Sequence, residues 1–114
     1  MNFFKSLFGG DKAVGVAEAK ARIDSRDPLV ILDVRSADEY RSGHIPGAKL
    51  IPLNELRSRL SELPKDKQIL CVCRSGARSG SAVGHLTSAG FDAVNLSGGM
   101  MSWQGAGLPL KQGK

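Results

Sequence analysis

A short loop around Cys73 carries the residues with the clearest capacity for chemistry. A cysteine thiolate is a strong nucleophile, and positive charge and N–H donors near the sulfur favour it over the thiol. Two arginines and a turn-forming glycine follow the cysteine, in the order Cys73-Arg74-Ser75-Gly76-Ala77-Arg78. The backbone N–H groups of such a loop, together with the positive end of a following helix, form a cradle for anions. We therefore predict that Cys73 is a nucleophile in an anion-binding loop.

Both cysteines also have an interpretation without chemistry. Cys73 as an inert small residue in a turn would leave the flanking arginines unexplained. Cys71 lies two positions earlier, so in a regular strand it points to the same face as Cys73, one pleat deeper. We expect Cys71 to act there as a small hydrophobe. The alternative is a resolving thiol that forms a disulfide with Cys73, although so close a pair would be strained.

The elements that must position this loop alternate between strand and helix. Apolar runs predict buried strands over 29–34 and 69–72, and shorter strands over 49–51 and 93–96. Helical spacing, a capping box of Ser36 and Glu39, and helix-breaking residues predict helices over 16–23, from Ser36 onward, over 53–63, and from the loop to about residue 89. Gly80 and Gly84 would weaken the last helix, which we explain by close packing of that helix on the sheet.

This alternation predicts an α/β protein with a mainly parallel central sheet flanked by helices on both faces. Sheets of this kind bind ligands at the carboxyl ends of their strands, which is where Cys73 lies. The chain of 114 residues has room for one domain, expected over 13–114 after an N-terminal tail, 1–12. The net charge of +5 and an aromatic content of 5% do not favour a nucleic-acid partner.

The tail is rich in phenylalanine and leucine around Lys5. We expect it to pack on the domain or to fray, because two helical turns are marginal on their own. The alternative is a short amphipathic segment that contacts a membrane or a partner protein. With two cysteines too close in sequence to staple a fold and no visible secretory signal, we expect a cytoplasmic location.

Three groups of residues resemble the rhodanese-like domain family. The first group runs from Asp33-Val34-Arg35 through Glu39-Tyr40 to the segment 43–48, and the second is the loop from Cys73 to Ser79. The third comprises Gly98-Gly99, Trp103 and Gly107-Leu108-Pro109. The resemblance covers residues 13 to 110 in the order typical of the family. It implies the rhodanese-like fold.

The resemblance also implies a function. Cys73 would take sulfane sulfur from a donor such as thiosulfate, carry it as a persulfide and pass it to a thiophilic acceptor such as cyanide or a thiol. The substrate-binding positions would be Arg74, Ser75, Gly76, Ala77 and Arg78. No cofactor and no metal are implied. This is the activity of a thiosulfate sulfurtransferase, with a protein sulfur donor or acceptor as a further possibility.

Two other polar positions are assigned to support. Asp33 could pair with an arginine and hold it in place. We expect Asp33 and Arg35 to support the residues of the site without taking part in catalysis. His44 could pair with the thiolate of Cys73, but its place in a glycine-proline turn favours a structural role. His85 lies about two turns into the helix after the loop, which is too far along to reach Cys73.

Other functions are compatible with parts of the pattern. Dual-specificity phosphatases of the cell-cycle type share the fold but separate cysteine and arginine by five residues. Here four residues lie between Cys73 and Arg78, and Ser79 stands where that arginine would fall. Arsenate reduction would have Cys71 as its candidate resolving thiol. A sulfur-relay or protein-interaction module is the remaining alternative, although pure scaffolds of this family have lost the cysteine.

Overall fold

The computed structural model describes residues 12–114. The expectation for the tail 1–12 concerns residues that, apart from Lys12, lie outside this part of the chain. Within 12–114, no helix combines the length and the apolar character needed to cross a membrane.

A five-stranded sheet forms the centre of the molecule, and all its strand pairs are parallel. The spatial order of its strands is β1-β5-β4-β2-β3. Their bounds are β1 Ala13–Val14, β2 Leu29–Asp33, β3 Lys49–Leu50, β4 Gln68–Val72 and β5 Ala93–Leu96. β4 is central and every one of its residues is buried, as expected for a parallel strand covered on both faces. The predicted fold class is confirmed.

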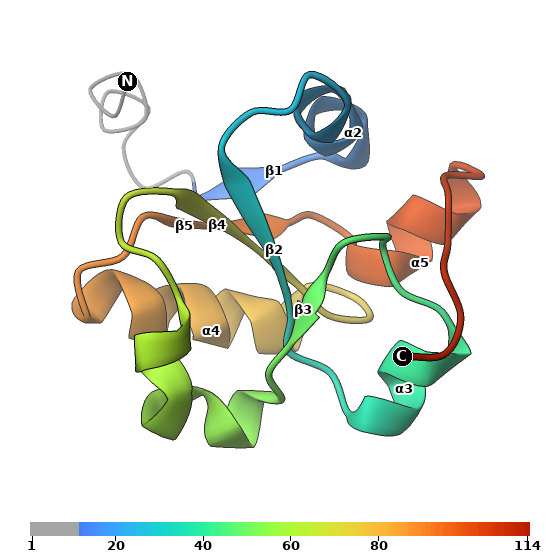
Figure 1. Cartoon of the computed structure of the whole chain (residues 1–114). Helices are drawn as coiled ribbons and strands as arrows, with labels where there is room; N and C mark the ends of the chain where they lie inside the picture. The colour runs from blue at the N-terminus through green and yellow to red at the C-terminus, as the bar shows by residue number, and fades with distance from the viewer. Residues whose placement is uncertain (1–11) are drawn as a thin grey trace.

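Helices cover both faces of the sheet (Figure 1). They are α2 Val16–Asp24, α3 Ala37–Ser42, the 3₁₀ helix η1 Leu53–Glu62, α4 Ala77–Ser88 and α5 Gly99–Gly105. One hydrophobic core joins the sheet to η1 and α4 and includes Leu56, Leu86 and both cysteines. The second core lies on the opposite face and includes Ala19 of α2 and Met100 and Trp103 of α5. Cys71 and Cys73 therefore share the α4 face of the sheet, as the strand alternation predicted.

The local signals for helix ends were accurate. Ser36 and Glu39 form the predicted capping box, in which each side chain bonds the other residue's backbone N–H. The segment 53–63 differs from the prediction, because it is a 3₁₀ helix with non-helical backbone angles at Arg59. Leucines three and four residues apart suit either helix type, so their spacing does not distinguish them. Helix α5 was not predicted; it has seven residues and begins after a glycine in a left-handed conformation.

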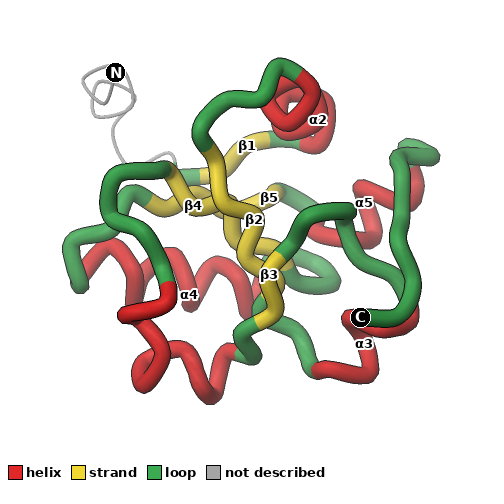
Figure 2. Tube along the Cα trace, viewed as in Figure 1, coloured by secondary structure: helices red, strands yellow, loops and turns green. Residues whose placement is uncertain are grey.

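The C-terminal segment runs back across α3 and ends beside it (Figure 2). The backbones of His44 and Lys111 exchange two hydrogen bonds of 2.9 Å each. The indole N–H of Trp103 donates to the carbonyl of Pro109 at 2.8 Å. The segment thereby ties α5 to the turn that follows α3.

The expectation that Gly80 and Gly84 allow α4 to pack closely on the sheet is not supported at either position, because both would accommodate a Cβ atom at ordinary contact distances or in open space. A Cβ atom at Gly80 would lie 3.6 Å from the side-chain nitrogen of Asn95 on β5, whereas one at Gly84 would meet nothing within 4 Å. Gly84 is exposed, so packing does not explain it.

We predict that Gly84→Ala stabilises the protein, because alanine loses less backbone entropy than glycine when a helix forms and meets no obstacle here. The expected gain is about 0.5–1 kcal/mol in the free energy of unfolding, measured by urea denaturation. A loss of stability would show that Gly84 has a packing role that the structure does not display.

Candidate active site

Cys73 lies immediately beyond the carboxyl end of β4, at the floor of the loop that leads into α4. Its side chain is 0% exposed, whereas Arg74 and Ser75 at the rim of the loop are exposed. Gly76 has a φ of +108°, a left-handed angle that confirms the predicted need for glycine. The structure thus places the predicted nucleophile at a sheet edge of the kind that binds ligands in α/β proteins.

Two hydrogen-bond donors point at the sulfur of Cys73. The backbone N–H of Gly76 lies 3.1 Å from Sγ, and the hydroxyl of Ser79 lies 3.2 Å from it. Burial by itself raises the pKa of Cys73, but hydrogen bonds from the side chain and backbone of Ser79 and from the backbones of Gly76 and Ser75 lower it more. The net pKa lies below the ordinary value, so the loop favours the thiolate.

Groups from α5 and β5 hold three backbone carbonyls of the loop. The N–H groups of Met100 and Met101, in the first turn of α5, donate to the carbonyls of Cys73 and Arg74 at 2.8 and 3.0 Å. The side-chain amide of Asn95 donates to the carbonyl of Gly76 at 3.0 Å. The Arg74 carbonyl belongs to the same peptide as the Ser75 N–H, so the hydrogen bond from Met101 turns towards the sulfur one of the backbone N–H groups that lower the pKa of Cys73.

Gly99 makes this close approach possible. Its φ is +55°, and a Cβ atom there would lie 2.3 Å from the carbonyl oxygen of Cys73 and 2.6 Å from that of Arg74. Such distances leave no room for any side chain, so the backbone of α5 can approach the loop only at a glycine. The sequence showed Gly98-Gly99 as part of a family resemblance without this physical role.

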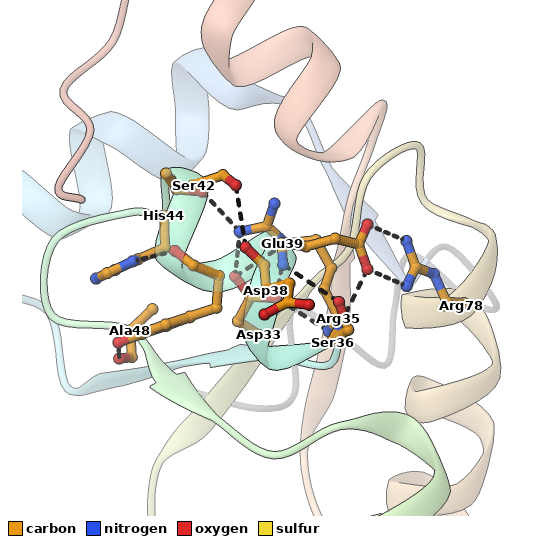
Figure 3. A network of polar contacts seen from close by, with 11 residues as sticks. Asp33, Arg35, Ser36, Asp38, Glu39, Ser42, His44, Ala48 and Arg78 are labelled. Atoms are coloured by element: carbon orange, nitrogen blue, oxygen red, sulfur yellow. Dashed lines mark hydrogen bonds and ion pairs between the residues drawn. The ribbon is translucent and has the colours of Figure 1, made fainter. Parts of the chain in front are cut away.

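The two loop arginines have different surroundings. Arg78 forms a bidentate ion pair with Glu39 of α3, with N–O distances of 2.7 and 2.8 Å (Figure 3). Arg74 is exposed at the rim. The hydrogen bonds from Arg78 hold the pKa of Glu39 at about 2. Arg78, which we predicted to bind an anionic substrate, therefore already holds a carboxylate, and Arg74 is the more accessible cation.

Asp33 and Arg35 pair with each other at the carboxyl end of β2 (Figure 3). Arg35 donates to both carboxylate oxygens of Asp33, at 2.9 and 2.7 Å, and to the carbonyl of Gly43 at 2.8 Å. Both side chains are almost fully buried. This pair braces the connection from β2 to the turn after α3, so the arginine that Asp33 holds is Arg35 and not a loop arginine.

The remaining candidates lie outside the contacts of the Cys73 sulfur. The ring of His44 stacks on Tyr40 with centroids 3.6 Å apart, and its Nδ1 bonds the carbonyl of Tyr40 at 2.7 Å. These contacts give His44 a structural environment. His85 lies 3.5 Å from Arg57 on the exposed side of α4. Burial, and then the charge of Cys73, raise the pKa of Cys71 to about 12, so Cys71 is a protonated thiol at neutral pH.

Sequence reasoning missed two polar contributors. Ser79 was noted as the residue after Arg78, and its buried hydroxyl contacts Sγ. Asn95 was treated only as part of a strand, although its side chain bonds both Ser79 and Gly76. A lone amide in the otherwise apolar strand Ala93–Leu96 was the available signal. Within 12–114, no three His, Cys, Asp or Glu side chains are grouped so as to hold a metal ion.

Comparison with known proteins agrees with this fold. The profile of the Rhodanese-like domain family matches residues 15–106. The chain belongs to this family.

Relatives and solved structures support the assignment. The chain is 37% identical over 98 residues to "Putative sulfurtransferase YtwF" of Bacillus subtilis, covering 86% of this chain and 95% of that protein. It is 38% identical over 90 residues to a protein of Allochromatium vinosum named "Sulfurtransferase", covering 78% and 84%. The crystal structure of a rhodanese-like domain protein from Staphylococcus aureus superposes with a TM-score of 0.82 at 36% identity, covering 90% of this chain and 99% of the other.

We predict that Gly99→Ala slows alkylation of Cys73 by iodoacetamide at neutral pH by about tenfold or more, because displaced loop amides no longer stabilise the thiolate. Peptide mapping by mass spectrometry would measure the rate. Gly105→Ala is the matched control, since a Cβ at this other end of α5 meets nothing within 4 Å. Equal rates in the two variants would contradict the role given to Gly99.

We predict that Glu39→Gln lowers stability at neutral pH by roughly 0.5–1 kcal/mol, since the ion pair is partly exposed. The folded-state pKa of Glu39 is about 2 against an ordinary 4.5, so the carboxylate contributes its stabilisation fully above 4.5 and loses it as the pH falls towards 2. Urea denaturation of both proteins should therefore give a difference that shrinks over this range. A difference independent of pH would contradict the pairing.

Proposed function

We propose that this protein is a sulfurtransferase that moves sulfane sulfur through a persulfide on Cys73. The observation that carries the proposal is the environment of Sγ, which accepts from the Gly76 amide at 3.1 Å and the Ser79 hydroxyl at 3.2 Å. These donors favour a thiolate, which is the form that attacks sulfur. The names of its relatives, which include sulfurtransferases, point to the same reaction class.

We propose thiosulfate as one donor. In the first half-reaction the Cys73 thiolate attacks the outer sulfur of thiosulfate, the sulfur–sulfur bond of thiosulfate breaks, and sulfite leaves with the bonding electron pair. Cys73 then carries a persulfide whose terminal sulfur holds the negative charge. In the second half-reaction cyanide or a thiolate attacks this terminal sulfur and returns Cys73 as a thiolate, so no redox partner is required.

The loop supplies what both half-reactions need. The exposed guanidinium of Arg74 suits the oxyanion end of the donor. Arg78 remains paired with Glu39, and its positive charge also interacts electrostatically with Cys73. The inward amides of positions 75 and 76 stabilise negative charge on sulfur before and after transfer. Because Cys71 and Cys73 are both free thiols, we propose that the protein works in a reducing compartment such as the cytoplasm.

We predict that brief exposure to thiosulfate adds one sulfur atom to the wild-type protein and none to Cys73→Ser, as measured by intact-mass spectrometry. Cyanide should remove that atom with formation of thiocyanate. Cys71→Ala should behave like the wild type, since Cys71 is buried with a pKa of about 12.

Each other result has a definite meaning. Sulfur gained by Cys73→Ser would contradict the proposed nucleophile, and loss of activity in a folded Cys71→Ala variant would contradict the packing role of Cys71. If thiosulfate adds no sulfur but a protein persulfide does, the protein is a relay and thiosulfate is the wrong donor. If neither adds sulfur, sulfur transfer is wrong, and hydrolysis of phosphate esters or reduction of arsenate would be assayed on the same loop.

A further inference from the structure

Ser79 and Asn95 form a short hydrogen-bonded chain behind the sulfur of Cys73. Ser79 lies in α4, one turn beyond Gly76, and its side chain is 0% exposed. Its Oγ is 3.2 Å from Sγ of Cys73 and 2.5 Å from Oδ1 of Asn95. The hydroxyl of Ser79 therefore stands between two acceptors, one on the nucleophile and one on β5.

The orientation of the Asn95 side chain follows from its other contact. Its Nδ2 donates to the carbonyl of Gly76 at 3.0 Å, and a carbonyl can only accept. The nitrogen of the carboxamide must therefore face Gly76, which turns Oδ1 towards Ser79. Asn95 thus presents a fixed acceptor to a buried hydroxyl.

A hydroxyl has one proton, so Ser79 can donate fully to only one of these acceptors at a time. When Sγ is a thiolate, it is the stronger acceptor because it carries the charge. When Sγ is neutral, as in the thiol or as the inner sulfur of a persulfide, the amide oxygen of Asn95 is the stronger acceptor. Without that second acceptor, the buried hydroxyl would lose its partner each time the sulfur lost its charge, at a cost in free energy.

We propose that Asn95 is a positioning residue of the transfer site, whose Oδ1 accepts the hydrogen bond of the Ser79 hydroxyl whenever the sulfur of Cys73 is neutral and loses it to Sγ when that sulfur is charged. The proposal rests on the proposed function, because it is persulfide chemistry that moves charge on and off Sγ during each turnover.

The sequence of events in the two half-reactions follows directly. As Sγ attacks the outer sulfur of the donor, its electron pair forms the new sulfur–sulfur bond, the pair of the broken bond leaves with sulfite, and the outer sulfur keeps a negative charge. Sγ is then neutral, and the Ser79 hydroxyl turns to Asn95. As the acceptor takes the terminal sulfur, the bond between the two sulfurs breaks and its electron pair returns to Sγ. The hydroxyl then turns back and stabilises the departing thiolate.

Other charged groups around Cys73 must be kept constant in any test. Arg78 of α4 interacts electrostatically with both Cys73 and Asp33 of β2, and it is bonded to Glu39 of α3. The Cys71 thiol lies on the same face of β4. None of these groups is altered by substitution of Ser79 or Asn95, so they act equally in every variant.

The experiment measures the pH dependence of alkylation of Cys73 by iodoacetamide, followed by peptide mapping, which needs no sulfur donor. Ser79→Ala should raise the midpoint, with about tenfold slower alkylation at neutral pH for each unit of pKa. Asn95→Asp and Asn95→Ala are then each made with and without Ser79→Ala. In each such double-mutant cycle, the effect of Asn95 on the Cys73 pKa through its bond to Gly76 cancels, since that bond is lost equally with and without Ser79.

For each substitution of Asn95, the coupling is the change it causes in the Cys73 pKa when Ser79 is present minus the change when Ser79 is absent. We expect this coupling to be positive for Asn95→Asp and negative for Asn95→Ala. Asn95→Asp places a stronger acceptor beside the hydroxyl, so it should raise the Cys73 pKa more when Ser79 is present than when it is absent. Asn95→Ala removes the competing acceptor, so it should raise the pKa less, or lower it, when Ser79 is present. Asn54→Asp, at an exposed asparagine of η1, is the control for one added carboxylate and should leave the midpoint unchanged.

Coupling of the same sign for both substitutions, or no coupling, would overturn the proposal, since either result would mean that Asn95 acts only through loop structure or charge. If one variant fails to fold by circular dichroism, the coupling of the other still decides. Because alkylation uses no sulfur donor, its outcome is separate from the thiosulfate experiment. Opposite coupling in a protein that gains no sulfur would retain the switch of the Ser79 hydrogen bond and refute only the sulfurtransferase.

Discussion

The site depends on the hydrogen bonds by which α5 holds the carbonyls of Cys73 and Arg74. Two N–H groups at the start of that helix have no acceptor within the helix, and here they donate to the loop at 2.8 and 3.0 Å. The same contacts cap α5, and the bond to the Arg74 carbonyl orients the peptide whose N–H, that of Ser75, faces the sulfur. Gly99 is the residue that lets the two backbones approach. These two backbone hydrogen bonds thus link the second hydrophobic core, through α5, to the electrostatics of Cys73.

Two separate ion pairs, Asp33–Arg35 and Glu39–Arg78, lie near the loop. Asp33 and Arg35 neutralise each other in the interior and also bind the Gly43 carbonyl, so their pairing supports the backbone near α3. Glu39 of α3 then pairs with Arg78 at the start of α4. The capping box of α3 holds the Glu39 carboxylate from its other side, through the Ser36 amide. Arg78 is thereby fixed in position, while Arg74 remains exposed.

Much of the fold followed from short-range patterns. The apolar runs around Ile31 and Leu70 predicted two central parallel strands, and the Ser36 and Glu39 pair predicted the start of α3. Such signals are local, because side-chain periodicity and capping involve residues only a few positions apart. The 3₁₀ character of η1 and the existence of α5 were missed, since a leucine spacing shared by two helix types and a seven-residue helix carry little local information.

The sequence by itself determined the fold class and identified Cys73 and its loop as the candidate nucleophile and anion site, because Cys73 and its neighbours are contiguous and the strands have a regular pattern. Only the tertiary structure decided that Arg78 is committed to Glu39, 39 positions away, and that Asn95 reaches both Ser79 and Gly76. These partners come from different elements of the sheet and its covering helices. Their contacts arise from how the layers pack, and no spacing along the chain encodes that geometry directly.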